Sequence, residues 1–145
     1  MSADLRRRSV WPYALAAIVS LVGLGDSIYL TIEHITGQSV RCTVIAGCSE
    51  VLGSSYAVVA GIPLAAVGAA AYFGVFSLAT LAAFGYRHAG TLLALLVVIM
   101  FLMTLWVLYL QAFVIHHFCQ FCLLSALVTF VLTGLVVAQR RLRAA

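Results

Sequence analysis

The feature that most constrains the fold of this chain is a series of four long apolar runs. They cover about residues 10–33, 61–84, 90–115 and 119–138. A helix of about 20 apolar residues spans the hydrocarbon core of a bilayer. Since 65% of the 145 residues are hydrophobic and 8% are charged, the chain has more apolar surface than a water-soluble domain of this length can bury. The sequence therefore predicts an all-α membrane protein, a four-transmembrane-helix bundle that forms a single domain over residues 1–145.

The arginines predict the orientation of this bundle. Four spans place both termini on one side, and that side also receives Arg6, Arg7, Arg8, Arg87, Arg140, Arg141 and Arg143. Arg41 falls on the opposite side. Because positive residues concentrate in cytoplasmic segments, we expect both termini to be cytoplasmic. The net charge of +4 then has a membrane explanation, and we expect no nucleic-acid partner.

The interval between the first two spans is the longest polar stretch, and it holds Cys42 and Cys48. Ser49–Val59 mixes apolar residues with Ser and Glu, which predicts a short interfacial helix in this first outer loop. We expect the first span to be retained rather than cleaved as a signal peptide, since it is too long for a typical signal sequence and lacks a convincing cleavage site. All four cysteines then lie on the outer face, where a bacterial inner or plasma membrane, or the endoplasmic reticulum lumen, permits disulfides.

A second cysteine pair, Cys119 and Cys122, begins the fourth span. Two cysteines three residues apart on a helix share a face, and a helix start at this point favours a thiolate through its free N–H groups and dipole. Two dithiols on one side of a membrane can pass electrons by thiol–disulfide exchange. The water-facing pair and the membrane-facing pair therefore suit transfer from a soluble thiol to a lipid-soluble acceptor, for which a quinone is the obvious candidate.

Nearly the whole chain resembles the vitamin K epoxide reductase family in its bacterial form. The matching pieces, in order, are Gly25–Thr31, Cys42-x5-Cys48-Ser49, Ser54–Ala57, Gly61-Ile62-Pro63 and Cys119-x-x-Cys122. The resemblance implies a bundle around a quinone of the menaquinone, ubiquinone or vitamin K type. It also implies a quinone-dependent thiol–disulfide oxidoreductase that re-oxidises a thioredoxin-like partner and so supports disulfide bond formation. We expect that partner to be a separate, DsbA-like protein on the outer side, since the sequence shows no such domain.

The resemblance further implies a role for each cysteine. Cys119 and Cys122 match the active-site pair of the family, with Cys122 facing the quinone. Cys42 and Cys48 match the shuttle pair, in which Cys42 meets the partner protein and Cys48 reaches Cys119.

Two further positions match residues beside the quinone in the family, Ser54 and Tyr56. The vertebrate enzymes hydrogen-bond vitamin K with an Asn and a Tyr, whereas this chain has Ser125-Ala126 at the corresponding end of the fourth span. The difference favours disulfide formation, and reduction of vitamin K quinone or epoxide is the alternative function.

Polar residues inside or beside the spans are additional candidates. Asp26 is costly to bury as a charge, so a functional or partnered role is the default, although it can simply line polar space near the outer interface. Gln111 can hydrogen-bond a quinone oxygen or a neighbouring helix. His34, His116 and His117 can tune thiolates or relay protons, or do neither.

Rival interpretations come from other classes of protein. The cysteines, with or without the neighbouring histidines, can form a metal site, and two inert disulfides can staple a purely structural membrane bundle. We expect no metal. The other quinone-linked disulfide oxidase family, DsbB, has the same helix count, but its Cys-x-x-Cys precedes its spread pair, the reverse of the order here.

Overall fold

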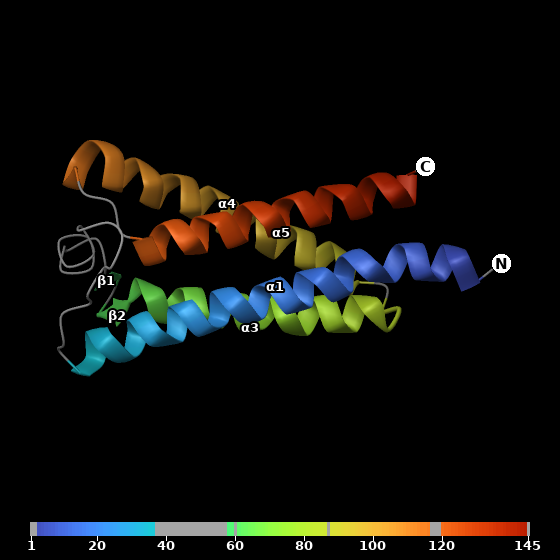
Figure 1. Ribbon diagram of the computed structural model, residues 1–145, viewed down its shortest axis with the longest axis horizontal. Helices are drawn as coiled ribbons and strands as arrows, with labels where there is room; N and C mark the ends of the chain where they lie inside the picture. The colour runs from blue at the N-terminus through green and yellow to red at the C-terminus, as the bar shows by residue number, and fades with distance from the viewer. Residues whose placement is uncertain (1–2, 37–57, 60, 87, 117–119, 145) are drawn as a thin grey trace.

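Four long helices lie side by side along the length of the molecule in the computed structural model (Figure 1). The structure describes residues 3–36, 58–59, 61–86, 88–116 and 120–144. The helices are α1 (Ala3–Thr36), α3 (Leu64–Ala83), α4 (Ala89–Tyr109) and α5 (Gln120–Ala144). A π-helix, η2 (Leu110–Ile115), continues α4 directly.

Four helices within these described ranges are long and apolar enough to cross a membrane. Their spanning segments are Val10–Thr36, Leu64–Ala83, Ala89–Ile115 and Gln120–Arg141. The predicted all-α fold with four transmembrane helices is therefore confirmed. Helix α3, the second span, begins at Leu64, three residues later than predicted, because Ile62 and Pro63 belong to a strand.

The outer surface of the bundle is apolar, as a lipid-facing surface must be. Each helix presents large hydrophobic side chains that are between 59% and 61% exposed, among them Ile18, Phe73, Leu102 and Leu127. Exposed apolar area on this scale marks a membrane or protein contact, since monomeric soluble proteins avoid it. With helices of spanning length, it identifies an integral membrane protein.

The helices pack in a ring, in which α1 contacts α3 and α5, and α4 contacts the same two helices. Small side chains allow this close packing, since Ala16 of α1 and Ala79 of α3 are buried in the core beside Val75, Leu93 and Leu132. Figure 1 shows the N-terminus, the C-terminus and the α3–α4 turn at one end of the bundle, which we call the termini end.

A short antiparallel hairpin lies at the opposite end, which we call the hairpin end (Figure 1). Strand β1 (Val58–Val59) pairs with β2 (Ile62–Pro63), and Gly61 in the turn has φ +82°. The predicted interfacial helix over Ser49–Val59 is thus wrong at its last two residues, where β-branched valines next to a glycine turn form a strand. The remainder of that predicted helix lies outside the described residues.

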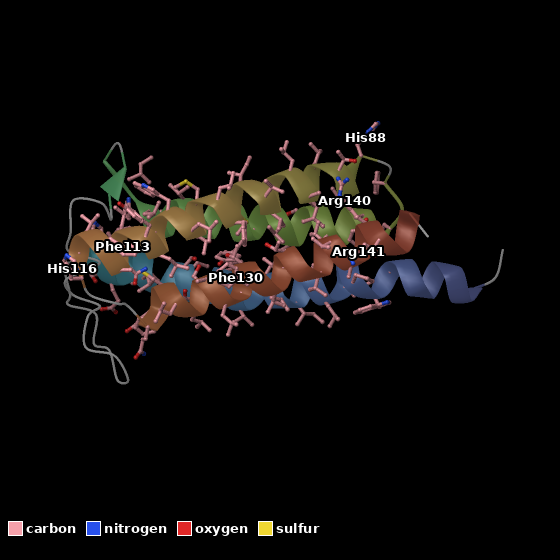
Figure 2. The ribbon with its side chains drawn as sticks, turned by 90° about the horizontal axis from the view of Figure 1, so that it is seen from above. His88, Phe113, His116, Phe130, Arg140 and Arg141 are labelled. Carbon is pink, nitrogen blue, oxygen red and sulfur yellow. The ribbon has the colours of Figure 1, made fainter. Side chains whose placement is uncertain are left out.

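Figure 2 places His116 and Phe113 at the hairpin end, and His88, Arg140 and Arg141 toward the termini end. His116 has φ +62°, a left-handed conformation that ends η2. Histidine is one of the few residues other than glycine that adopt this conformation with some frequency. The continuous helix formed by α4 and η2 therefore ends at Ile115, a few residues before the Cys-x-x-Cys motif.

Candidate functional site

A cavity of about 340 Å³ lies in the half of the bundle nearer the hairpin. Its volume falls in the range of about 300–1,000 Å³ that is common for small-molecule sites. All four helices, η2 and the hairpin residue Pro63 contribute to its wall. Most of the wall is aliphatic, and Leu30, Val67, Leu96, Met100 and Val107 are representative. The cavity therefore suits an apolar ligand that is held within the membrane.

The inner part of the wall carries a buried hydrogen-bonded cluster around Tyr72 of α3. The Tyr72 hydroxyl lies 2.6 Å from Oγ of Ser125, 3.0 Å from the Ser125 carbonyl oxygen and 3.2 Å from Oγ1 of Thr129. Thr129 in turn donates to the Ser125 carbonyl oxygen at 3.0 Å. These bonds tie α3 to α5 and hold the aromatic ring in a single position.

Glycine makes room for that ring. A Cβ atom at Gly23 of α1 would overlap the ring of Tyr72, which is only 2% exposed. At Gly68 of α3 a Cβ atom would come to 3.3 Å from Oγ of Ser27. The approach of α1 and α3 beside the cavity thus depends on residues that lack a side chain.

Asp26, one of the predicted site residues, lies on the cavity wall. Its side chain is 9% exposed, and neither carboxylate oxygen has a hydrogen-bond partner among the residues that the structure describes. Leu30 and His34 follow at intervals of four residues and line the same cavity, so they share one face of α1. His34 is exposed, which marks an opening of the cavity at the hairpin end.

Gln111 reaches the cavity from η2 and is fully buried. Its position depends on the π-helix, in which the wider turn changes the direction of the side chains that follow. Such turns are rare and often occur at functional sites. The amide of Gln111, the candidate from the third span, therefore lines the same cavity as Asp26.

Cys122 is half-buried and also lines the cavity. Cys122 lies in the first turn of the described part of α5, which begins at Gln120. The free N–H groups in the first turn of a helix favour negative charge. Phe121 packs against Tyr29 of α1 with ring centroids 5.3 Å apart. This contact holds the start of α5, and with it the thiol, against the helix that carries Asp26.

The structure thus brings three of the predicted site residues together on one cavity, namely Asp26, Gln111 and Cys122. The other predicted site residues, Cys42, Cys48, Ser54, Tyr56 and Cys119, lie outside the described residues. Within the described part of the chain, no three His, Cys, Asp or Glu side chains are grouped as a metal site would require.

Sequence reasoning missed Tyr72 and Thr129 and treated Ser125 only as a departure from a family pattern. Tyr72 is a polar-tipped aromatic within an Ala- and Gly-rich stretch of α3, Ala65–Gly74, and a small-residue stretch of this kind is a signal for close helix packing. That Thr129 lies next to Tyr72 follows from the crossing of two helices, which a linear pattern does not contain.

Comparison with known protein families gives a match over most of the chain. Residues 14–137 match the family model described as the vitamin K epoxide reductase family. The match covers most or all of each spanning helix and every residue of the site described above. The family is one of membrane oxidoreductases that are generally linked to quinones. This chain therefore belongs to the vitamin K epoxide reductase family and is an integral membrane oxidoreductase.

Proposed function

We propose that this protein is a quinone-dependent thiol–disulfide oxidoreductase that re-oxidises a thioredoxin-like partner. The observation that carries the proposal is the meeting of a thiol, a carboxyl group and an amide on one apolar cavity, from Cys122, Asp26 and Gln111. Within a bilayer, such a cavity is open to lipid-soluble ligands. A quinone combines an apolar ring and tail with two polar oxygens, which matches this distribution.

The residues present fit a quinone on two grounds. The wall is aliphatic except for a few polar groups, and Asp26 has buried oxygens without a hydrogen-bond partner in the described part of the chain. Gln111 supplies an amide on the same wall and is proposed to orient a carbonyl oxygen. Ser54 and Tyr56 are proposed as further contacts by the resemblance. When bound, the quinone accepts the two electrons that oxidation of a dithiol releases.

The chemistry of the chain itself is thiol–disulfide exchange. We assign Cys122 to the cavity and Cys119 to exchange with the loop pair. Cys42 receives the attack of the reduced partner, and Cys48 passes the electrons to Cys119. A thiolate in the first turn of a helix is favoured by the N–H groups there, which suits Cys122 as the group that reacts next to the quinone.

The proposed orientation puts both termini in the cytoplasm and the cysteines outside. Arg140 and Arg141 lie toward the termini end in Figure 2, and Arg6–Arg8 belong to the first turns of α1. Positive side chains at this end favour the cytoplasmic side. The partner, proposed to be a separate DsbA-like protein, then meets the hairpin end from an oxidising compartment such as the outside of a bacterial membrane.

The test begins with the purified protein, its absorption spectrum and its lipid extract. We expect a quinone in the extract and quinone-dependent oxidation of a thioredoxin-like dithiol protein. Cys48→Ser should accumulate a mixed disulfide with the partner on non-reducing gels, since no neighbouring thiol resolves it. Cys42→Ser should form no such adduct, and Cys119→Ser should show a visible absorption band from the Cys122 thiolate held against the quinone ring.

Two outcomes would contradict the proposal. Efficient capture of the partner by Cys42→Ser would show that the assigned direction of exchange is wrong. Dithiol oxidation that proceeds without any quinone would remove the proposed acceptor. The same preparation, supplied with vitamin K epoxide and a dithiol, distinguishes the alternative activity, for which we expect no turnover.

A further inference from the structure

The reduction of a quinone needs protons as well as electrons, and the cavity wall contains few groups that can supply them. Among its described residues, the side chains that can release a proton are Asp26, His34, Tyr72 and Cys122. The remaining wall is apolar or carries amide and hydroxyl groups that do not ionise near neutral pH.

Three of these four groups are poorly placed or already committed. The hydroxyl of Tyr72 is held by Ser125 and Thr129. Cys122 serves the thiol chemistry of the proposed function. His34 is two helical turns beyond Asp26, about 12 Å along α1 toward the opening at the hairpin end, so it lies at the mouth of the cavity rather than beside its centre.

Asp26 has the opposite character. It is buried in the wall, and both of its oxygens lack a hydrogen-bond partner among the described residues. An unpaired carboxyl group inside a membrane span is costly, and such groups are usually kept where protons or ions move. A purely structural carboxyl group would be expected to bond a neighbouring hydroxyl or amide, and Asp26 bonds none among the residues that the structure describes.

We propose that Asp26 is the proton carrier of this site and donates a proton to a carbonyl oxygen of the quinone as the electron pair arrives. The inference rests on the proposed function. Oxidation of the dithiol breaks two S–H bonds, forms one S–S bond and releases two electrons and two protons. Conversion of the quinone to the hydroquinone consumes the same two electrons and two protons, so no further oxidant or reductant is needed. Asp26 regains its proton through the opening of the cavity at the hairpin end, where His34 is exposed.

The titratable groups that line the cavity with Asp26 come from three elements. They are His34 on α1, Tyr72 on α3 and Cys122 on α5, whereas α4 and η2 contribute none to the described wall. A change in the pH dependence of the reaction therefore has to be separated from the titration of the thiol. Variants of Asp26 and an added small acid make that separation.

The experiment uses the full chain in lipid nanodiscs, with dithiothreitol as the donor and decylubiquinone or menadione as the acceptor. Asp26→Asn keeps the shape of the side chain but cannot carry a proton. General acid–base catalysis typically contributes 100-fold or more, so we expect hydroquinone formation at saturating quinone to slow by about 100-fold. Formate, a small carboxylic acid, should restore part of the rate. Asp26→Glu should stay within about 10-fold of the unchanged protein.

Two measurements report on the site without turnover. Quinone affinity, measured by quenching of tryptophan fluorescence, should change by less than about twofold in Asp26→Asn, which is below the range of about 2- to 13-fold expected for one lost hydrogen bond. Infrared difference spectra between the oxidised and reduced protein should contain a carboxyl band that shifts in D2O and is missing in Asp26→Asn. Ser20→Ala is the matched control, because Ser20 is a buried polar residue of α1 that bonds its own helix and lies outside the cavity.

The outcomes separate this inference from the proposed function. If the unchanged protein reduces quinone and Asp26→Asn does so at a similar rate, the proton carrier is refuted while the proposed function stands. If Asp26→Asn is slow, is not rescued by formate and has lost quinone affinity, Asp26 only positions the quinone and the inference is again refuted. If the unchanged protein reduces no quinone, both the proposed function and the proton carrier are refuted.

Discussion

Gly23→Ala tests the packing that shapes the cavity, because it adds one methyl group where α1 meets the ring of Tyr72. The added Cβ atom would overlap that ring. Tyr72 cannot easily move away, since it is 2% exposed and its hydroxyl is bonded to Ser125 and Thr129. The substitution must therefore separate the two helices or break the hydrogen-bonded cluster.

Two costs and one gain decide how much the free energy of unfolding changes. Overpacking a well-packed core costs about 1–3 kcal/mol, and each lost hydrogen bond costs about 0.5–1.5 kcal/mol. Alanine in place of a helical glycine stabilises the helix by up to about 1 kcal/mol, which offsets part of this cost. We therefore expect the free energy of unfolding to fall by about 1–4 kcal/mol.

The assay is reversible unfolding in detergent micelles by titration with sodium dodecyl sulfate, followed by circular dichroism. Gly25→Ala is the matched control, since the same change two residues along α1 meets no atom within 4 Å. It should leave stability unchanged or slightly higher. If Gly23→Ala proves as stable as Gly25→Ala, α1 and Tyr72 do not approach each other as closely as the structure indicates.

Two other predictions concern orientation and quinone binding. A membrane-impermeant thiol reagent, applied to intact cells after mild reduction, should label the protein from outside, and labelling only after lysis would overturn the proposed topology. Gln111→Leu should weaken quinone binding by about 2- to 13-fold, the equivalent of one hydrogen bond, as measured by fluorescence quenching. An unchanged affinity would exclude Gln111 as a quinone contact.

The fold class could be predicted because its signal is local. Each spanning helix is read from hydrophobicity summed over about 20 consecutive residues, and errors at single positions have little effect. The prediction was less successful at the ends of the spans. Val58–Val59 form a strand rather than the end of a surface helix, since the partner strand Ile62–Pro63 is needed to decide between them.

The candidate site could be predicted only in part, because its residues come from different helices. Asp26 and Cys122 stand out in sequence as an acid inside a span and a thiol at the start of one. Tyr72 does not stand out, since its importance comes from Gly23 on another helix and from Ser125 on a third. The π-helix that carries Gln111 likewise has no pattern in the sequence that we recognised.

Tyr72 belongs both to the packed core and to the wall of the cavity, and this shared position links stability to function. Toward the termini end, small and branched residues such as Ala79 and Val75 fill the space between the helices. Toward the hairpin end, the wall carries polar groups that the core does not need for packing, including Asp26 and Gln111. The hydroxyl of Tyr72 fixes α5 at Ser125 and Thr129, about one and two turns from Cys122. A variant that moves this ring is therefore expected to change the distance between the thiol and the carboxyl group as well as the stability of the bundle. Loss of activity in such a variant must therefore be compared with its unfolding. Asp26→Asn replaces no residue of the Tyr72 cluster and so separates the chemistry from the packing.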